Sequence, residues 1–196
     1  MMYDNEFVSS WKERGRRQFR DFEAVLTKLP EIEILEWKNK NGSCDYRIRF
    51  LFDEKAQSMT VTGDLGTAVF VFTEPATFDR ISRYTSLDYF FEKMKASTDE
   101  YYYVSDKEIF LEELEKYAGL SFYRNDNNKV EIDELIDTLW DLYGMDGIEL
   151  DNETYTELYR YCDDIYEWIG DVGKRIHPRV ILWLEALHCA REALEK

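Results

Sequence analysis

The sequence predicts a single α+β domain, with an N-terminal helix, an antiparallel meander of about four strands, and a helical C-terminal half. Apolar residues recur every three or four positions near the N-terminus and throughout the second half, a pattern typical of amphipathic helices. Residues 32–72 alternate instead between apolar and polar side chains, as half-buried strands do. No repeat or Gly- or Pro-rich linker marks a boundary. We therefore expect residues 1–196 to form one domain, with an acidic helical part at 108–196 that follows the helix, meander and short helices of 1–107.

The first helix is expected over residues 7–29. Its apolar stripe steps by three or four residues from Phe7 to Leu29. Pro30 ends the predicted helix, because proline disfavours the helical conformation of the preceding residue. The other face is basic, and we expect its cations to pair with carboxylates of the acidic half or of a partner rather than with nucleic acid. They are Lys12, Arg14, Arg16, Arg17 and Arg20.

The meander is expected to follow directly. Strands are predicted at residues 31–36, 46–52, 58–62 and 67–72. Asn41-Gly42 predicts a hairpin between the first two strands. Gly63-Asp64-Leu65-Gly66 predicts a tight turn between the last two, in which the Asp64 carboxylate would accept hydrogen bonds from local backbone amides.

From Pro75 onward the apolar spacing is helical. Ser86 is expected to cap one helix, and Ser105 and Glu108 form a capping box ahead of another. Pro178 suits the first turn of the last helix, with His177 at its start. Helices are predicted at residues 78–84, 86–94, 105–118, 130–143, 152–169 and 178–194.

The charge of the chain excludes some partners. With 25 Lys plus Arg and 41 Asp plus Glu, the net charge of −16 repels nucleic-acid phosphates and anionic membranes. We expect no direct DNA binding and no membrane partner, and no apolar stretch resembles a signal peptide or a membrane span. Three widely spaced cysteines favour free thiols in a reducing cytoplasm.

The excess negative charge is concentrated in one segment. Residues 108–171 hold 19 acidic and 4 basic residues, a net charge of −15. Carboxylates in rows can occupy the sites on a basic surface that would otherwise hold phosphates, although a solvated face that aids solubility gives the same pattern. The predicted partner-binding carboxylates lie opposite the apolar stripes of two helices. They are Asp133, Glu134, Asp137, Asp141, Glu157, Asp163, Asp164 and Glu167.

No motif predicts catalysis. The sequence has no P-loop, dinucleotide fingerprint or nucleophile elbow, so we expect no enzyme and no evident cofactor. His188 is expected to be a core or interface residue. The alternative is a zinc site in which Cys162 combines with His188 or Cys189 and a carboxylate.

Three segments resemble a family of small, uncharacterised phage and prophage proteins. The segment from Val61 to Phe70 carries the GDLG turn, and Tyr89-Phe90-Phe91-Glu92-Lys93 is similar to the YF-x-x-K helix of that family. The ending Trp183 to Ala190 is similar to its closing helix, although Ala186-Leu187-His188 stands where Gly-Leu-Lys is usual. The resemblance implies a phage or prophage origin and no particular reaction.

Small acidic phage proteins without enzyme motifs are often inhibitors of host defence, of which anti-CRISPR proteins are the example. The expected function is therefore inhibition of a bacterial defence nuclease. The acidic helices would bind a nucleic-acid-binding effector such as Cas9 in the host bacterial cytoplasm, as a monomer or dimer, and block access of DNA or guide. Two alternatives remain open: a regulatory or housekeeping protein of a mobile element that acts through protein–protein contacts, and a metal-binding domain or enzyme that uses Cys162, His188 or Asp64.

Overall fold

The chain folds as two compact units. The computed structural model describes residues 5–98, 101–103, 106–118, 129–144, 147–148, 152–159 and 165–196. Residues 3–100 and 177–196 make the first, here the sheet unit, and residues 101–176 make the second, here the helical unit. The α+β class is confirmed, with an N-terminal helix, a six-stranded antiparallel sheet and further helices in the C-terminal half. The organisation as one domain stays a prediction.

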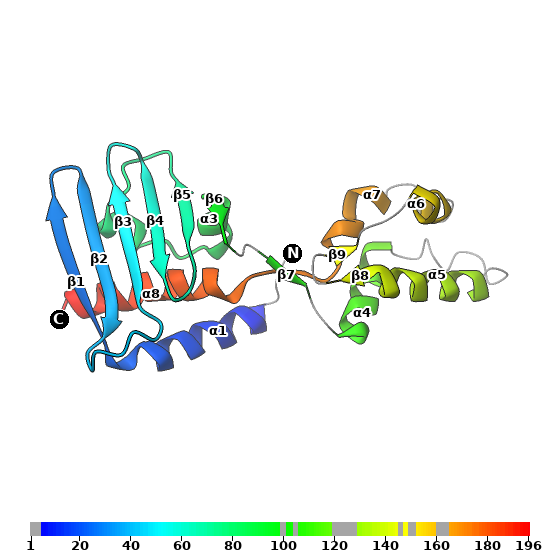
Figure 1. The fold of residues 1–196 in the computed structure, drawn as a ribbon, viewed down its shortest axis with the longest axis horizontal. Coiled ribbons are helices and arrows are strands. Elements are labelled where there is room, and N and C mark those ends of the chain that lie inside the picture. The colour runs from blue at the N-terminus through cyan, green and yellow to red at the C-terminus, as the bar shows by residue number, and fades with distance from the viewer. Residues whose placement is uncertain are drawn as a thin grey trace. The chain divides into compact units, whose positions relative to one another are not determined.

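The sheet unit is built on a meander in which each strand pairs with the next along the chain (Figure 1). The four predicted strands are present, and one further strand is added at each edge. The strands are β1 (Phe22–Leu29), β2 (Ile32–Asn39), β3 (Ile48–Asp53), β4 (Ser58–Gly63), β5 (Ala68–Val71) and β6 (Met94–Ser97).

The prediction of a helix up to Leu29 is wrong for its last third. Helix α1 (Asn5–Gln18) and a single 3₁₀ turn η1 (Phe19–Asp21) lead directly into strand β1. Leu26 of β1 lies opposite Leu35 of β2, and this pairing satisfies the backbone of both strands. Pro30 does not end a helix; it opens a two-residue turn in which Glu31 takes a φ of 64°.

The predicted helix over residues 86–94 is also too long. Helix α3 (Leu87–Glu92) begins as expected, because the Ser86 hydroxyl accepts a hydrogen bond from the backbone N–H of Tyr89. Met94 then starts strand β6, where it pairs with Phe70 of β5. Its apolar side chain therefore completes the sheet rather than the face of a helix.

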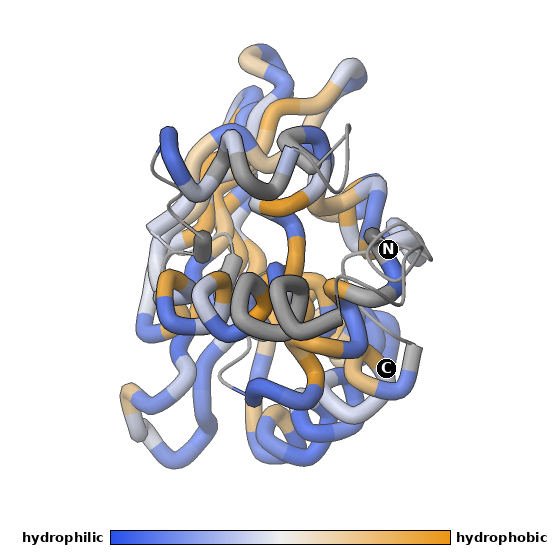
Figure 2. Tube along the Cα trace, turned by 90° about the vertical axis from the view of Figure 1, so that its right-hand side faces the viewer, coloured by the Kyte–Doolittle hydropathy of each residue, from blue (hydrophilic) through white to orange (hydrophobic). Residues whose placement is uncertain are grey.

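Helices α1 and α8 (Pro178–Leu194) run alongside each other and cross the strands, as Figure 1 shows. Alternate residues of β3 are fully buried and the others face outward, so one face of the sheet is covered. Residues 180–187 of α8 are buried on every side, the pattern of a helix inside a core. Trp183 packs edge-on against Phe70, with ring centroids 6.2 Å apart. In Figure 2, orange hydrophobic stretches alternate with blue hydrophilic stretches along the chain.

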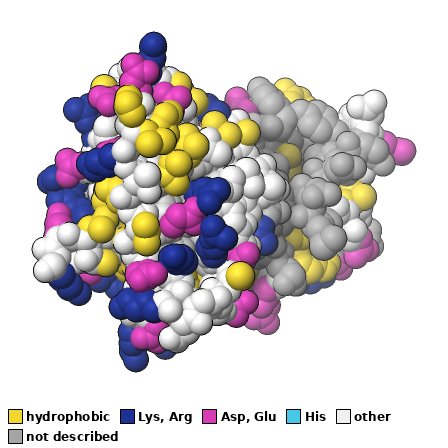
Figure 3. All heavy atoms as spheres, turned by 60° about the vertical axis from the view of Figure 1, so that its left-hand side comes forward, with side chains coloured by type: hydrophobic (Ala, Val, Ile, Leu, Met, Phe, Trp, Pro, Cys, Tyr) yellow, Lys and Arg dark blue, Asp and Glu magenta, His cyan; other side chains and the backbone are white. Residues whose placement is uncertain are grey.

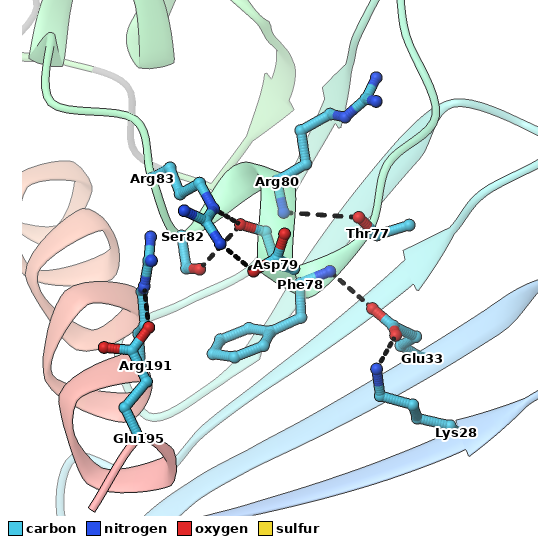
Figure 4. A network of polar contacts seen from close by, with 10 residues as sticks. All are labelled: Lys28, Glu33, Thr77, Phe78, Asp79, Arg80, Ser82, Arg83, Arg191 and Glu195. Carbon is cyan, nitrogen blue, oxygen red and sulfur yellow. Dashed lines mark hydrogen bonds and ion pairs between the residues drawn. The ribbon is translucent and has the colours of Figure 1, made fainter.

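A network of polar contacts fixes helix α2 (Phe78–Ile81) to the sheet (Figure 4). The Glu33 carboxylate of β2 accepts a hydrogen bond from the backbone N–H of Phe78 at 2.6 Å and pairs with Lys28 of β1 at 3.0 Å. The hydrogen bond from Arg83 lowers the pKa of Asp79, since it stabilises the ionised carboxylate. These polar groups form hydrogen bonds and ion pairs with one another, so the role of the network is structural.

The helical unit has a core of its own. Its helices are α4 (Lys107–Ala118), α5 (Lys129–Leu142), α6 (Asn152–Tyr159) and α7 (Ile165–Trp168), followed by the 3₁₀ turn η4 (Ile169–Asp171). The chain enters through β7 (Tyr101–Tyr103) and leaves through β10 (Lys174–Ile176), which pair antiparallel, and β8 (Tyr143–Gly144) pairs with β9 (Gly147–Ile148). The buried cluster comprises Phe110, Leu114, Ile136, Leu139, Trp168, Ile169 and Val172.

Two predictions about this unit extend beyond the described residues. Ser105 and Gly119, the expected cap and end of α4, lie outside them, as do residues 160–164 within the helix predicted at 152–169. The described cap of α4 is Asp106, whose carboxylate accepts a hydrogen bond from the backbone N–H of Glu108 at 2.9 Å. Within the described part of the chain, no helix combines the length and apolarity needed to cross a membrane.

Candidate functional site

The charge of the chain divides along the boundary between the two units. The helical unit holds 20 acidic and 7 basic residues, a net charge of −13, whereas the rest of the chain holds 21 and 18, a net charge of −3. Figure 3 shows acidic and basic side chains interspersed over one face of the sheet unit. The acidic segment found in the sequence therefore corresponds to a compact unit with its own core.

The packing of α4 and α5 decides which of their carboxylates face outward. Ile136 and Leu139 of α5 are buried in the core of the helical unit and Trp140 packs against it, whereas Asp137, Thr138 and Asp141 are exposed. Asp137 and Asp141 are spaced four residues apart, so they share one exposed side of this helix. On α4, Glu108 and Glu112 have the same spacing and are also exposed.

The structure describes three of the eight predicted binding carboxylates in full. The side chains exposed as predicted are those of Asp137, Asp141 and Glu167. Three more lie on described helices, but their side chains are outside the described set: Asp133, Glu134 and Glu157. The remaining two, Asp163 and Asp164, lie wholly outside the described residues.

Other carboxylates of the helical unit have structural roles. The Glu113 carboxylate of α4 accepts a hydrogen bond from the backbone N–H of Gly173 at 2.7 Å and pairs with Arg175 of β10, which fixes the exit strand against α4. Asp171 pairs with Lys174 at 3.1 Å, and Asp137 with Lys107 at 2.9 Å.

The carboxylates available to a partner are those without such a contact. Among the residues that the structure describes in the helical unit, five exposed carboxylates have neither an ion-pair partner nor the capping role of Asp106: Glu108, Glu112, Asp141, Glu153 and Glu167. Our set of predicted binding residues omitted Glu108, Glu112 and Glu153. The spacing of four residues between Glu108 and Glu112 could have identified the first two from the sequence.

The basic face of α1 is partly used within the sheet unit. Arg16 pairs with Glu185 of α8 at 2.6 Å and with Glu192 at 3.0 Å, and the guanidinium of Arg14 lies 4.6 Å from the centre of the Trp11 ring. The expected intramolecular pairing is therefore found for Arg16, with two carboxylates of α8 that lie in the acidic helical part at 108–196. Burial raises the pKa of Glu185, but the neighbouring His188, whose Nδ1 atom lies 3.8 Å from the carboxylate, and the charge of Arg16 outweigh it and leave that pKa below its usual value.

The histidines and cysteines occupy structural positions. The Nδ1 atom of His177 accepts a hydrogen bond from the backbone N–H of Arg179 at 3.2 Å, so the residue caps α8 as predicted. The Nε2 atom of His188 lies 2.7 Å from the carbonyl oxygen of Tyr84, and its ring is largely buried, as expected for a core residue. Burial raises the pKa of Cys189 to about 12. No three His, Cys, Asp or Glu side chains of the described residues gather closely enough to hold a metal ion, and Cys162 lies outside those residues.

Asp64 occupies the turn predicted for it, but in a different role. Gly63 takes a φ of 136°, and the backbone N–H of Asp64 donates to the carbonyl oxygen of Arg47 at 3.0 Å. Backbone hydrogen bonds thus stabilise the turn, and the exposed Asp64 carboxylate accepts no hydrogen bond from a described residue, contrary to the prediction. The turn lines one side of a pocket of about 520 Å³ in the sheet unit.

Comparison with family models, with curated proteins and with solved structures found no match.

Proposed function

We propose that this chain is a binding protein whose helical unit binds a basic, nucleic-acid-binding surface on a protein partner. The observation that carries the proposal is the net charge of −13 within the 76 residues of one compact unit. Solvated protein surfaces commonly intersperse charges of both signs. A surface with charges of one sign instead favours binding to a partner surface of the opposite sign.

Five carboxylates on α4, α5, α6 and α7 would take the place of phosphates in this interaction; they have no ion pair with any residue that the structure describes. Each carboxylate accepts charge-assisted hydrogen bonds from Lys and Arg, as a phosphate does. Repulsion between Glu108 and Glu112, spaced four residues apart, costs a few tenths of a kcal/mol in the free protein, and a cationic partner would relieve it. Binding of this kind weakens as salt concentration rises, because dissolved ions screen the charges.

The proposed partner is a bacterial defence nuclease, with Cas9 as the example. Such an effector carries a positively charged channel that holds a nucleic-acid heteroduplex. An acidic protein in that channel would block access of DNA or guide without catalysing a reaction. The resemblance of the GDLG turn and the YF-x-x-K helix to phage and prophage proteins supports this setting, in the cytoplasm of the bacterial host.

The experiment is a charge-reversal comparison in the full chain. One variant replaces Glu108, Glu112 and Asp141 of the helical unit by Lys. The control replaces three carboxylates of the sheet unit by Lys, so that the two variants have the same net charge. The control residues are exposed and have no ion pair among the described residues: Glu6, Glu13 and Glu54.

Both variants are tested for folding by circular dichroism, then for binding to guide-free effector and for inhibition of DNA cleavage. The helical-unit variant is expected to bind at least tenfold more weakly, since several charge-assisted contacts of about 1 kcal/mol or more are lost. The control is expected to bind within about threefold of the parent at the same salt concentration. An equal loss of affinity in both variants would show that only the total charge of the chain matters. That result would contradict a binding surface on the helical unit.

A further inference from the structure

Strand β1 lies at one edge of the six-stranded sheet and pairs with β2 on one side only. The register between these two strands is regular over all eight residues of β1, from Phe22 to Leu29. Alternate backbone N–H and C=O groups of β1 therefore point away from β2, and no strand among the described residues pairs with them. We propose that two copies of this chain pair antiparallel through their β1 strands and form one continuous sheet.

The two edges of the sheet differ in how they are protected against such pairing. Natural sheets protect an edge with a short strand, an irregularity in the register, an exposed lysine or a proline. Strand β6, at the opposite edge, has four residues, a register shift against β5 and the exposed Lys95. Strand β1 has a regular register, and Lys28, near its end, is held by an ion pair with Glu33 of β2 at 3.0 Å. Residues 22–27 therefore form an edge without these protections.

Exposed apolar side chains gather at the same edge. In the described part of the sheet unit, four large apolar side chains are 41–54% exposed: Val25, Leu29, Val71 and Leu194. The first two belong to β1, and Leu194 ends α8, a helix that contacts β1. Figure 1 shows the C-terminal end of α8 beneath this strand. A second sheet at this edge would remove apolar surface of both elements from water.

The sequence of β1 is compatible with pairing to its own copy. In a sheet that continues across a two-fold axis, opposite residues share a face, so odd-numbered residues lie opposite odd-numbered residues. An axis through Val25 places this residue opposite its own copy. Ala24 then lies opposite Leu26 of the second copy, and both are only partly buried in the single chain. Pairs of β-branched and apolar residues stabilise antiparallel strands, which favours a second copy as the occupant.

Electrostatic repulsion between two copies is small at this edge. With the axis at Val25, Glu23 lies opposite Thr27 of the second copy, so no like charges are directly opposed. Within each copy, the Glu23 carboxylate lies 3.6 Å from the Nζ atom of Lys38. The chain outside the helical unit has a net charge of only −3. The charges of this edge therefore do not oppose the pairing.

The first test is the oligomeric state of the full chain, measured by sedimentation equilibrium between about 1 and 200 µM. The parent is expected to dimerise. Val25→Lys places two like charges opposite each other at the axis and is expected to weaken the dimer at least tenfold. Val71→Lys is the matched control, because Val71 is as exposed as Val25 but lies on β5, within the sheet. It is expected to dimerise as the parent does, and circular dichroism checks that both variants fold.

Cysteine trapping tests the position of the axis. In Val25→Cys, the two new thiols would lie opposite each other, where Cα atoms of antiparallel strands are about 4.5–5.5 Å apart and a disulfide can form. Mild oxidation is expected to give a covalent dimer, and mass spectrometry of the linked peptides distinguishes this disulfide from one that involves Cys44. Val71→Cys, with a similarly exposed position, is expected to form no more covalent dimer than the parent.

Three results would overturn the proposal. The first is a parent that stays monomeric at about 200 µM, which would leave the β1 edge to a strand of another protein. The second is a dimer that Val25→Lys and Val71→Lys weaken equally, which would assign the association to the open face of the sheet. The third is a dimer that Val25→Lys leaves unchanged and that Val25→Cys does not cross-link, which would place the interface elsewhere in the chain.

Discussion

Replacing Arg16 by Met should destabilise the sheet unit by leaving a buried carboxylate without its cation. The side chain of Glu185 is only 3% exposed, and Arg16 of α1 reaches it at 2.6 Å. A Cβ atom on the neighbouring Gly15 would lie 3.4 Å from the Cγ atom of Glu185, so the two helices approach closely at this point. In the variant, the carboxylate keeps His188 nearby, with its Nδ1 atom 3.8 Å away, but loses the charge of the guanidinium.

The magnitude follows from how deeply the pair is buried. Removing one partner of a fully buried ion pair lowers the free energy of unfolding by about 3–5 kcal/mol. Arg16 is 52% exposed, and water therefore screens the pair. We expect a loss of about 2 kcal/mol, which corresponds to a fall in melting temperature of roughly 4–8 °C in a chain of this size. The double variant Arg16→Met, Glu185→Met should recover much of that loss, because it leaves no buried charge.

The assay is thermal and urea unfolding followed by circular dichroism, with Arg17→Met as the control for loss of one surface charge. The pKa of Glu185 is lowered in the folded state, so the ion pair stabilises the fold above the unfolded pKa of about 4.3. Its contribution is lost as pH falls through the folded value. The difference in free energy of unfolding between the parent and Arg16→Met should therefore be largest at pH 7 and decrease towards pH 3. A difference in free energy of unfolding that is the same at both pH values would refute the reasoning. Equal stability of Arg16→Met and Arg17→Met at pH 7 would refute it as well.

Gly63→Ala should destabilise the protein by about 3 kcal/mol in urea unfolding, because its Cβ atom would lie 2.1 Å from the carbonyl oxygen of Arg47 and its φ is 136°. Gly42→Ala, also at positive φ but with no atom within 4 Å, should cost about 1 kcal/mol, and equal losses would show that the close contact has no effect. Iodoacetamide at pH 8 should label the exposed Cys44 much faster than Cys189, whose pKa of about 12 keeps the thiol protonated. Peptide mapping by mass spectrometry checks this, and equal rates would mean that Cys189 is more accessible than its burial indicates.

The boundary between α1 and β1 shows what local periodicity could not decide. Phe22 and Leu26 fit the helical stripe that begins at Phe7, and they equally fit one face of a strand, because a spacing of four suits both. In the structure, Leu26 pairs with Leu35 across the hairpin, and residues 22–29 therefore form a strand rather than a helix. Such pairing depends on residues outside the local window, and the sequence could have signalled it only through the turn at Pro30.

The two proposed binding surfaces differ in how far the sequence could predict them. The sequence predicts the acidic helices, because net charge per segment is a local property and the core positions Ile136 and Leu139 keep helical spacing. It does not predict the free edge of β1, since residues 22–29 continue the apolar spacing of the first helix and only their pairing with β2 makes them a strand. The position of that strand at the edge depends on the order of the strands in the sheet, which no local pattern gives.

The most direct test of the central claim is the affinity of the parent and of the two charge-reversal variants for guide-free Cas9, measured at low and moderate salt with DNA as competitor. The proposal predicts that the parent binds, that DNA competes with it, and that the helical-unit variant binds at least tenfold more weakly while the sheet-unit control does not. Binding that DNA leaves unchanged, or that both variants retain in full, would contradict a role for the acidic helices in occupying a nucleic-acid-binding surface.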